Sequence, residues 1–364
     1  MMNHSEIIAP FPSVEKITTI PVLKALGDAR HALGELRGIA RGLSDRGIPM
    51  DTLYLQEALA SSAIEGIIIT PDDAFRAFSL SDSASSKAKE VVHHYDAMQQ
   101  GHADWLEVGC ISESVLISMF RILKPSGDGY RTQPGTNLIN LRTREVVYKP
   151  PQAPQVVVQL MRDLEGFINT DASDGHHPLI RMALIHHRFE SIHPFPDVNS
   201  RIGRILNLMY LIHMGLLDAP ILYLSRAISA SKPDYYRLLQ KVRTDDAWED
   251  WVIYMLNAVT QTARSTLKSV ESLLKTVLYT KKRMRRELPR IYSQDLLNNL
   301  FRFPYTRFEL LAKDIDRESQ TARRYLKELT KKGFVREVKH GRNNYYINDP
   351  LVALLTHIQA GGVE

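Results

Sequence analysis

Apolar residues recur every three or four positions along much of this chain, which is the pattern of amphipathic helices. Between residues 179 and 212, two such segments flank a short polar stretch, and Gly215 ends the second. The positions that keep this spacing are Leu179, Met182, Leu184, Ile185, His186 and Phe189, then Ile205, Leu208, Met209, Leu211 and Ile212. The sequence predicts a mainly α protein, with hairpins near residues 137–149 and 333–347.

The polar stretch, residues 193–204, reads His-Pro-Phe-Pro-Asp-Val-Asn-Ser-Arg-Ile-Gly-Arg. It contains a base that titrates near neutral pH, a hard oxygen ligand, an amide and two guanidinium groups. It also leads into a helix N-terminus, whose backbone N–H groups and positive dipole suit a phosphate. Polar residues this dense between two buried helices indicate a ligand site.

This stretch resembles the signature of the Fic (Fido) family, His-Pro-Phe-x-Asp/Glu-Gly-Asn-Gly-Arg-x-x-Arg. Val198 and Ser200 replace its two glycines, where backbone is expected to approach phosphate, and a β-branched residue resists positive φ. Six positions match in register: His193, Phe195, Asp197, Asn199, Arg201 and Arg204.

Most Fic proteins transfer AMP from ATP to a protein hydroxyl, so the resemblance implies a protein adenylyltransferase that modifies a Ser, Thr or Tyr hydroxyl. The target is another protein or this chain itself. The alternative is a pseudoenzyme that keeps the fold without turnover and acts as a nucleotide- or DNA-binding regulatory module. The two departures from the signature separate these readings.

The chemistry of the side chains suggests their roles. His193 is the natural general base for the incoming hydroxyl. Asp197 suits a Mg²⁺ ion held jointly with the phosphates of ATP. Asn199, with the N–H groups around Val198, Ser200 and Arg201, would form an anion cradle. The guanidinium groups of Arg201 and Arg204 would hold the β- and γ-phosphates.

A second motif lies at residues 57–66, Glu-Ala-Leu-Ala-Ser-Ser-Ala-Ile-Glu-Gly. Ser61 and Glu65 are four residues apart and share a helix face, and Gly66 is a good helix stop. The segment resembles the Fic inhibitory motif, Ser/Thr-x-x-x-Glu-Gly/Asn. In that family the glutamate pairs with the last signature arginine, here Arg204, and blocks the γ-phosphate. The alternative is an ordinary helix end with a solvated glutamate.

Two short apolar runs joined by a polar turn predict the hairpin at residues 137–149. It is similar to the Fic flap, which covers the nucleotide and aligns the target peptide by strand addition. The family also places a Tyr-Tyr pair near the nucleotide base, and Tyr235 is the expected contact here; the alternative is an aromatic pair in the core. The resemblance places the flap contacts at Asn137, Leu138, Ile139 and Asn140.

The motifs and the Fic resemblance together imply four parts: an N-terminal Fic segment with the inhibitory helix (1–105), a catalytic core (106–262), a polar connector helix (263–288) and a tail (289–364). The tail pattern of helix, helix and hairpin resembles a winged helix-turn-helix. Such a domain could contact either DNA or protein, and a protein contact includes a homodimer. The basic residues available to phosphates are Arg323, Arg324, Lys327, Lys339, His340 and Arg342.

Overall composition sets the remaining limits. A chain of 364 residues with 44% hydrophobic content is long enough for two or three domains with real cores. The single cysteine, Cys110, excludes an intramolecular disulfide and argues against a thiolate metal cluster. The N-terminus lacks a secretory pattern, and no apolar run approaches the ~20 residues that cross a bilayer. We therefore expect a cytoplasmic protein without a membrane partner.

Overall fold

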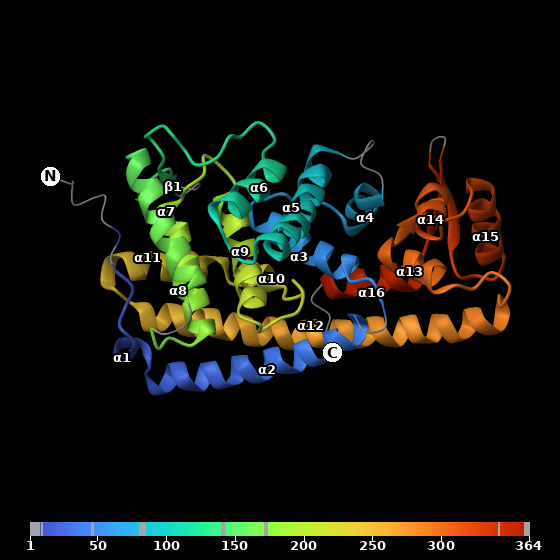
Figure 1. Cartoon of the computed structure of the whole chain (residues 1–364), viewed down its shortest axis with the longest axis horizontal. Coiled ribbons are helices and arrows are strands. Elements are labelled where there is room, and N and C mark those ends of the chain that lie inside the picture. The colour runs from blue at the N-terminus through green and yellow to red at the C-terminus, as the bar shows by residue number, and fades with distance from the viewer. Residues whose placement is uncertain are drawn as a thin grey trace. The chain divides into compact units, whose positions relative to one another are not determined.

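The computed structural model describes residues 8, 10–44, 47–79, 85–139, 143–170, 174–340 and 343–359. The chain is mainly helical, as the sequence predicts (Figure 1). It divides into two compact units, Met1–Gly34 with His93–Ala263, and Glu35–Val92 with Arg264–Glu364. The divisions fall within or beside three long helices, α2 (Ile20–Ser44), α5 (Ser86–Val108) and α12 (Trp248–Glu287). Within the described residues, no helix is both long enough and apolar enough to span a membrane.

The first unit is built around α8 (Pro178–Ile192) and α9 (Asn199–His213), which pack against each other. Almost every residue of both helices is buried, as expected for helices at the centre of a core rather than at its surface. Two helices flank this pair, α6 (Glu113–Leu123) and α7 (Pro154–Asn169). The remaining elements are α1 (Val14–Ile17), β1 (Leu138–Ile139), β2 (Val146–Tyr148), α10 (Leu224–Ala230) and α11 (Lys232–Asp245).

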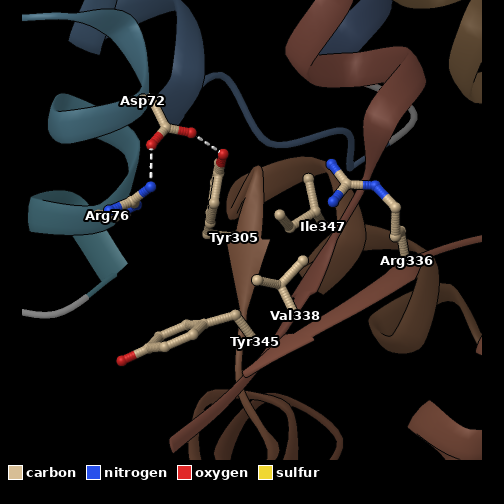
Figure 2. A pocket seen from close by; sticks show the side chains of 7 residues that line it. All are labelled: Asp72, Arg76, Tyr305, Arg336, Val338, Tyr345 and Ile347. Atoms are coloured by element: carbon tan, nitrogen blue, oxygen red, sulfur yellow. Dashed lines mark hydrogen bonds and ion pairs between the residues drawn. The ribbon is translucent and has the colours of Figure 1, made fainter. Parts of the chain in front are cut away.

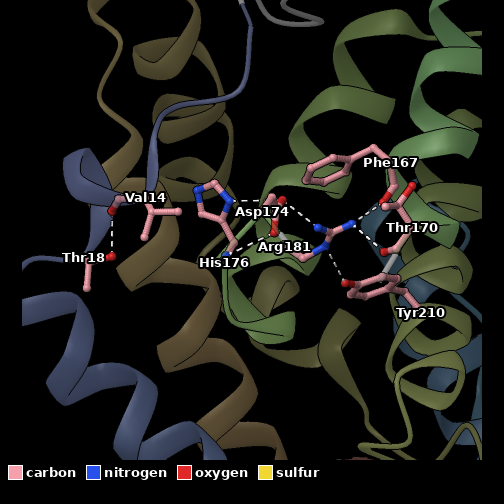
Figure 3. A network of polar contacts seen from close by, with 8 residues as sticks. All are labelled: Val14, Thr18, Phe167, Thr170, Asp174, His176, Arg181 and Tyr210. Atoms are coloured by element: carbon pink, nitrogen blue, oxygen red, sulfur yellow. Dashed lines mark hydrogen bonds and ion pairs between the residues drawn. The ribbon is translucent and has the colours of Figure 1, made fainter. Parts of the chain in front are cut away.

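A buried arginine fixes α8 to its neighbours (Figure 3). The Arg181 side chain is 1% exposed and pairs with Asp174 at 2.6 Å. It also donates to the carbonyls of Phe167 and Thr170 at the end of α7, and to the Tyr210 hydroxyl in α9. Because a buried charge is costly unless it is fully paired, this network specifies how α7, α8 and α9 meet. It thereby positions the loop that joins α8 to α9.

The second unit combines an N-terminal segment with the tail. Its sheet is antiparallel in the order β3-β5-β4. Helix α3 packs against α13 and α16, and α4 packs against β3 and α16. Its elements are α3 (Asp51–Ile64), α4 (Pro71–Ser79), α13 (Gln294–Arg302), β3 (Tyr305–Thr306), α14 (Phe308–Asp314), α15 (Ser319–Lys331), β4 (Arg336–His340), β5 (Asn343–Ile347) and α16 (Asp349–Gln359).

Specific side-chain contacts join α3 and α4 to the tail. Figure 2 shows Asp72 of α4 between Arg76 and the Tyr305 hydroxyl, which donates to it. Arg302 of α13 lies 3.6 Å from the carboxylate of Asp51, the first residue of α3. A small cavity of about 180 Å³ opens where α4 meets the sheet, lined by Asp72, Arg76, Tyr305, Arg336, Val338, Tyr345 and Ile347. The segment that carries the Ser61–Glu65 motif is thus part of the same unit as the tail.

The tail has the helix, turn, helix and hairpin order that its sequence pattern predicts. Its assignment as a winged helix-turn-helix stays a prediction. The predicted connector, residues 263–288, is the second half of α12, which runs unbroken from Trp248 to Glu287. The predicted four-part division therefore differs from the two compact units, because residues 35–92 pack with the distant residues 264–364.

Candidate active site

His193 ends helix α8. It is the C-cap residue, with φ 50° and ψ 60°, and its N–H donates to the Phe189 carbonyl at 2.9 Å. A left-handed residue at a helix end turns the chain sharply out of the helix. The imidazole is half-buried at the start of the loop that leads to α9.

The buried Arg131, from another segment of the chain, hydrogen-bonds to the backbone of this loop. Its Nε donates to the His193 carbonyl at 2.9 Å, and its own N–H donates to the Pro194 carbonyl at 2.8 Å. The same guanidinium donates to the carbonyls of Pro151 and Ile192. The buried guanidinium thus binds the carbonyls of Ile192 and His193 at the end of α8 and ties them to Pro151.

Phe195 and Asn199 close the loop from inside. The Phe195 ring is fully buried and stacks on Phe120, with centroids 4.5 Å apart. The Asn199 amide donates to the Phe195 carbonyl and accepts from its N–H, both at 2.8 Å. Phe195 therefore anchors the loop in the core. The Asn199 side chain braces the loop, so its contact with a phosphate stays a prediction.

The two departures from the signature differ in structural cost. Val198 is the N-cap of α9 and lies in the left-handed region, with φ 59° and ψ 14°. A β-branched residue is strained there by about 1–3 kcal/mol, because its side chain crowds the backbone. Ser200 lies in the first turn of α9 without positive φ, and its hydroxyl is 3.4 Å from the Glu190 carboxylate. The loop thus keeps, at Val198, a backbone path that a glycine adopts freely.

Asp197 lies at the exposed side of the loop. Its carboxylate pairs with Lys124 at 2.5 Å and accepts from the Val198 N–H at 2.8 Å. Burial raises its pKa, but the hydrogen bonds from Lys124 and Val198 and the charges of Lys124 and Arg201 outweigh burial, so the pKa is lowered. An ionised carboxylate here fits Mg²⁺, which takes one or two protein carboxylates and fills its other positions with phosphate and water. Within the described residues no cluster of three or more His, Cys, Asp or Glu side chains forms a cage for a metal.

The first two turns of α9 carry two buried guanidinium groups, Arg201 at 7% and Arg204 at 1% exposure. Their effect reaches two buried histidines. Burial, then the charge of Arg204, lowers the pKa of His186 to about 3. Burial and the charges of both arginines also lower the pKa of His94. The neighbourhood therefore holds positive charge on guanidinium groups and keeps imidazoles neutral, which suits a polyanionic ligand.

Gly203 allows α9 to lie close to α8. A Cβ atom at this position would be 2.8 Å from Glu190 Oε1 and 3.1 Å from the Phe189 ring. Any larger residue would push the arginines of α9 away from the end of α8.

The Tyr-Tyr pair divides between core and surface. Tyr235 is 1% exposed, and its hydroxyl is 2.8 Å from His186 Nε2, while Tyr236 is 46% exposed. Adjacent residues on a helix point in different directions, so only one of them enters the core. The predicted contact between Tyr235 and a nucleotide base stays untested, and Tyr236 is the more accessible ring.

The predicted hairpin is formed by β1 and β2, with Leu138 opposite Tyr148 and Ile139 opposite Val146. The Tyr148 hydroxyl donates to the Ser191 carbonyl at 3.0 Å, two residues before His193. The Arg243 guanidinium lies 3.8 Å from the centre of the Tyr148 ring. The hairpin is therefore anchored beside the end of α8. Asn137 donates to the Gly135 carbonyl, and Asn140 lies outside the described residues.

Comparison with known families agrees with this geometry. A model of the Fic/DOC family matches residues 111–211, which include the hairpin and the loop between α8 and α9. A Fic/DOC N-terminal model matches residues 23–103. A third, the C-terminal domain of SoFic-like protein adenylyltransferases, matches residues 277–351. The chain belongs to the Fic/DOC family.

Several relatives and solved structures share this family. A probable protein adenylyltransferase of Aquifex aeolicus is 29% identical over 144 residues, which is 39% of this chain and 41% of the relative. A protein adenylyltransferase Fic of Drosophila grimshawi is 35% identical over 65 residues, 18% of this chain and 14% of the relative. The chain thus spans less than half the length of these relatives.

Solved Fic structures show the same fold at low identity. A crystal structure of a Fic family protein from Desulfovibrio desulfuricans covers 94% of this chain and 98% of its own, with a TM-score of 0.56 and 19% identity. Fic-1 of Caenorhabditis elegans covers 70% and 73%, with a TM-score of 0.53 and 21% identity.

The Fic-like inhibitory motif ends α3. Ser61 is fully buried, Glu65 is the exposed C-cap residue, and Gly66 has φ 78°. The predicted helix stop at Gly66 is thus confirmed. Glu65 and Arg204 belong to different units, so their pairing stays a prediction.

Three side chains at this Fic site are absent from the motif-based prediction. Glu190 lies three residues before His193, one helical turn earlier. This spacing could have predicted from the sequence that Glu190 lies beside the site. Arg131 and Lys124 come from other segments, and only the fold brings them to the loop. The sequence shows no spacing that predicts their partners.

Proposed function

We propose that this protein transfers AMP from ATP to a Ser, Thr or Tyr hydroxyl of a protein. The observation that carries the proposal is the loop at residues 193–198. It places an imidazole at the end of α8 and two buried guanidinium groups at the start of α9. Relatives named protein adenylyltransferase support ATP as the nucleotide.

The reaction follows from these groups. The His193 imidazole takes the proton of the target hydroxyl, and the oxygen attacks the α-phosphorus of ATP. The bond from the α-phosphorus to the bridging oxygen breaks, and pyrophosphate leaves. Arg201 and Arg204 offset the charge that grows on the departing phosphates. Asp197 would hold Mg²⁺, which neutralises and orients the phosphates. Lys124 must release the Asp197 carboxylate oxygen for that contact.

The left-handed backbone of Val198 favours the enzyme over the pseudoenzyme alternative. A valine that abandoned positive φ would redirect the start of α9 and displace both guanidinium groups. Instead the loop keeps φ 59° despite the strain. The other support is the hairpin, whose exposed apolar residues Ile139, Val146 and Val147 suit a target segment added as a strand.

We further propose that Glu65 restrains this activity by occupying Arg204. Replacement of Glu65 by Gly should then raise self-labelling by ATP labelled at the α-phosphate. Label at the γ-phosphate should not transfer, because pyrophosphate leaves. The matched control is Glu107→Gly, which removes an exposed glutamate near the end of another helix, α5. The negative control adds His193→Ala to the Glu65→Gly variant.

The outcomes separate the two proposals. Equal labelling of wild type and Glu65→Gly would contradict inhibition by Glu65 and leave the transferase assignment intact. Absence of α-label in both, with Mg²⁺ and ATP present, would contradict the transferase assignment and favour the pseudoenzyme.

A further inference from the structure

Positive charge is concentrated at one end of the sequence. Residues 264–364 contain 21 of the 46 Lys and Arg residues but only 11 of the 41 Asp and Glu residues, a net charge of +10. The rest of the chain is net −5, which the total of +5 conceals. Such segregation is the electrostatic footprint of a polyanion-binding region.

Within that region, every charged residue that helix α15 exposes is basic, and the exposed acidic Glu318 is its N-cap. Ala322, Leu326 and Leu329 face the core, and the opposite side is exposed. The only acidic residue of α15, Glu328, is half-buried at the edge of this face. The exposed side chains are Ser319, Gln320, Arg323, Arg324, Lys327 and Lys331.

The end of α12 lies beside the end of α15. Arg283 donates to the carbonyls of Lys332 and Gly333, just after α15, and its guanidinium lies 4.2 Å from the centre of the Phe334 ring. Arg285 and Arg286 are exposed on the same turn, although Arg283 and Arg286 both pair with the carboxylate of Glu287. Arg283 is therefore the residue by which α12 contacts the C-terminal end of α15.

The described part of the tail lacks the apolar centre of a protein-binding surface, whereas Leu278 and Tyr279 are exposed on the preceding helix, α12. No large apolar side chain is exposed among the tail residues whose side chains the structure describes, 289–339 and 344–357. Protein–protein interfaces have an apolar centre and few lysines. Protein–DNA interfaces are strongly positive and polar.

We propose that α15 binds duplex DNA, with Arg324, Lys327 and Lys331 on backbone phosphates. A helix of this kind fits the major groove, and its first turn faces base edges. That turn presents Ser319 and Gln320, which are hydrogen-bonding side chains without charge. Arg323 is packed 3.5 Å from the centre of the Phe308 ring, so it also supports the helix.

The test compares two triple variants of the full-length chain. One replaces Arg324, Lys327 and Lys331 with alanine, sparing Arg323. The matched control replaces the exposed lysines Lys24, Lys87 and Lys89 with alanine, which removes the same charge from other helices. Binding to a labelled 25-base-pair duplex is followed by fluorescence anisotropy between 50 and 200 mM salt. Circular dichroism and thermal melting confirm that both variants fold.

The expected result is weaker binding and a flatter salt dependence for the α15 variant only. Three lost phosphate contacts should reduce the slope of log K against log salt by about 3. Equal slopes for the two variants would overturn the assignment to α15. Equally strong binding of single strands or of anionic vesicles would overturn the assignment to duplex DNA. DNA binding is measured without adenylyl transfer, so this test can refute the DNA-binding proposal without bearing on the proposed function.

Discussion

Val198 allows a direct test of the strained loop. Its φ of 59° is unfavourable for any residue with a Cβ by about 1–2 kcal/mol. Replacement with alanine keeps that penalty and removes two buried methyl groups, at a cost of roughly 1.5 kcal/mol. Replacement with glycine removes the same methyl groups but also removes the positive-φ strain. The greater conformational freedom of glycine in the unfolded state offsets about 0.5–1 kcal/mol of this gain. Val198→Gly should therefore be about 0.5–1 kcal/mol more stable than Val198→Ala.

This order is the reverse of the usual one. Ala103 is exposed in helix α5, where φ is negative, so Ala103→Gly should lose about 1 kcal/mol. Urea unfolding, followed by tryptophan fluorescence and circular dichroism, measures both comparisons. In thermal melts each kcal/mol should appear as a shift of about 2–4 °C. If Val198→Ala is as stable as Val198→Gly, Val198 is not strained, and the backbone argument for the loop fails.

The same loop can be tested for chemistry. In the Glu65→Gly background, the double change Val198→Gly, Ser200→Gly should raise the rate of AMP transfer, because an ångström of misplacement can cost about a hundredfold. Equal rates would show that this loop tolerates both side chains.

Two further predictions concern single residues. His193→Ala should abolish transfer while changing ATP affinity by less than about threefold, since a base acts on the hydroxyl and not on the phosphates. The labelling assay measures transfer, and isothermal titration measures ATP affinity. Loss of both transfer and ATP binding would assign His193 a structural role. Arg181→Ala should destabilise the fold by about 3 kcal/mol, because it leaves the carbonyls of Phe167 and Thr170 without this donor and leaves the Asp174 carboxylate with His176 as its remaining partner. Burial raises the pKa of Asp174 but the hydrogen bonds from Arg181 and His176 outweigh it, so the pKa is lowered. The stability gap between wild type and Asp174→Asn should therefore be full above about pH 4 and vanish as the pH falls through the lowered pKa. A gap independent of pH would contradict the ionised pair.

Local pattern was enough to predict the elements around the site. Helical spacing predicted the segments that became α8 and α9, and the conflict between a valine and positive φ was foreseeable at Val198. Gly66 marked the end of α3 because a glycine readily takes the left-handed turn found there. In each case the information lies within a few residues.

What the sequence could not predict depends on distant partners. Nothing near Arg131 indicates that it will hold the carbonyl of His193, sixty-two residues later. Tyr235 shares the helical spacing of Leu238, Leu239 and Val242, which indicates its burial. Its hydrogen bond with His186, forty-nine residues earlier, has no such signal. The continuity of α12 was foreseeable, because no glycine or proline occurs between Trp248 and Glu287. The boundary predicted at residue 263 instead falls inside this continuous helix.

The packing of α3 and α4 against the tail has a consequence for synthesis on the ribosome. Residues 35–92 emerge early, but their partners begin at Arg264, after 171 intervening residues. At roughly 5–20 residues per second, they wait on the order of ten seconds or more. The 93–263 segment is complete before Asp51 can meet Arg302 or Asp72 can meet Tyr305. Each new molecule must therefore complete the segment that contains His193 before the helix with Ser61 and Glu65 is fastened in place.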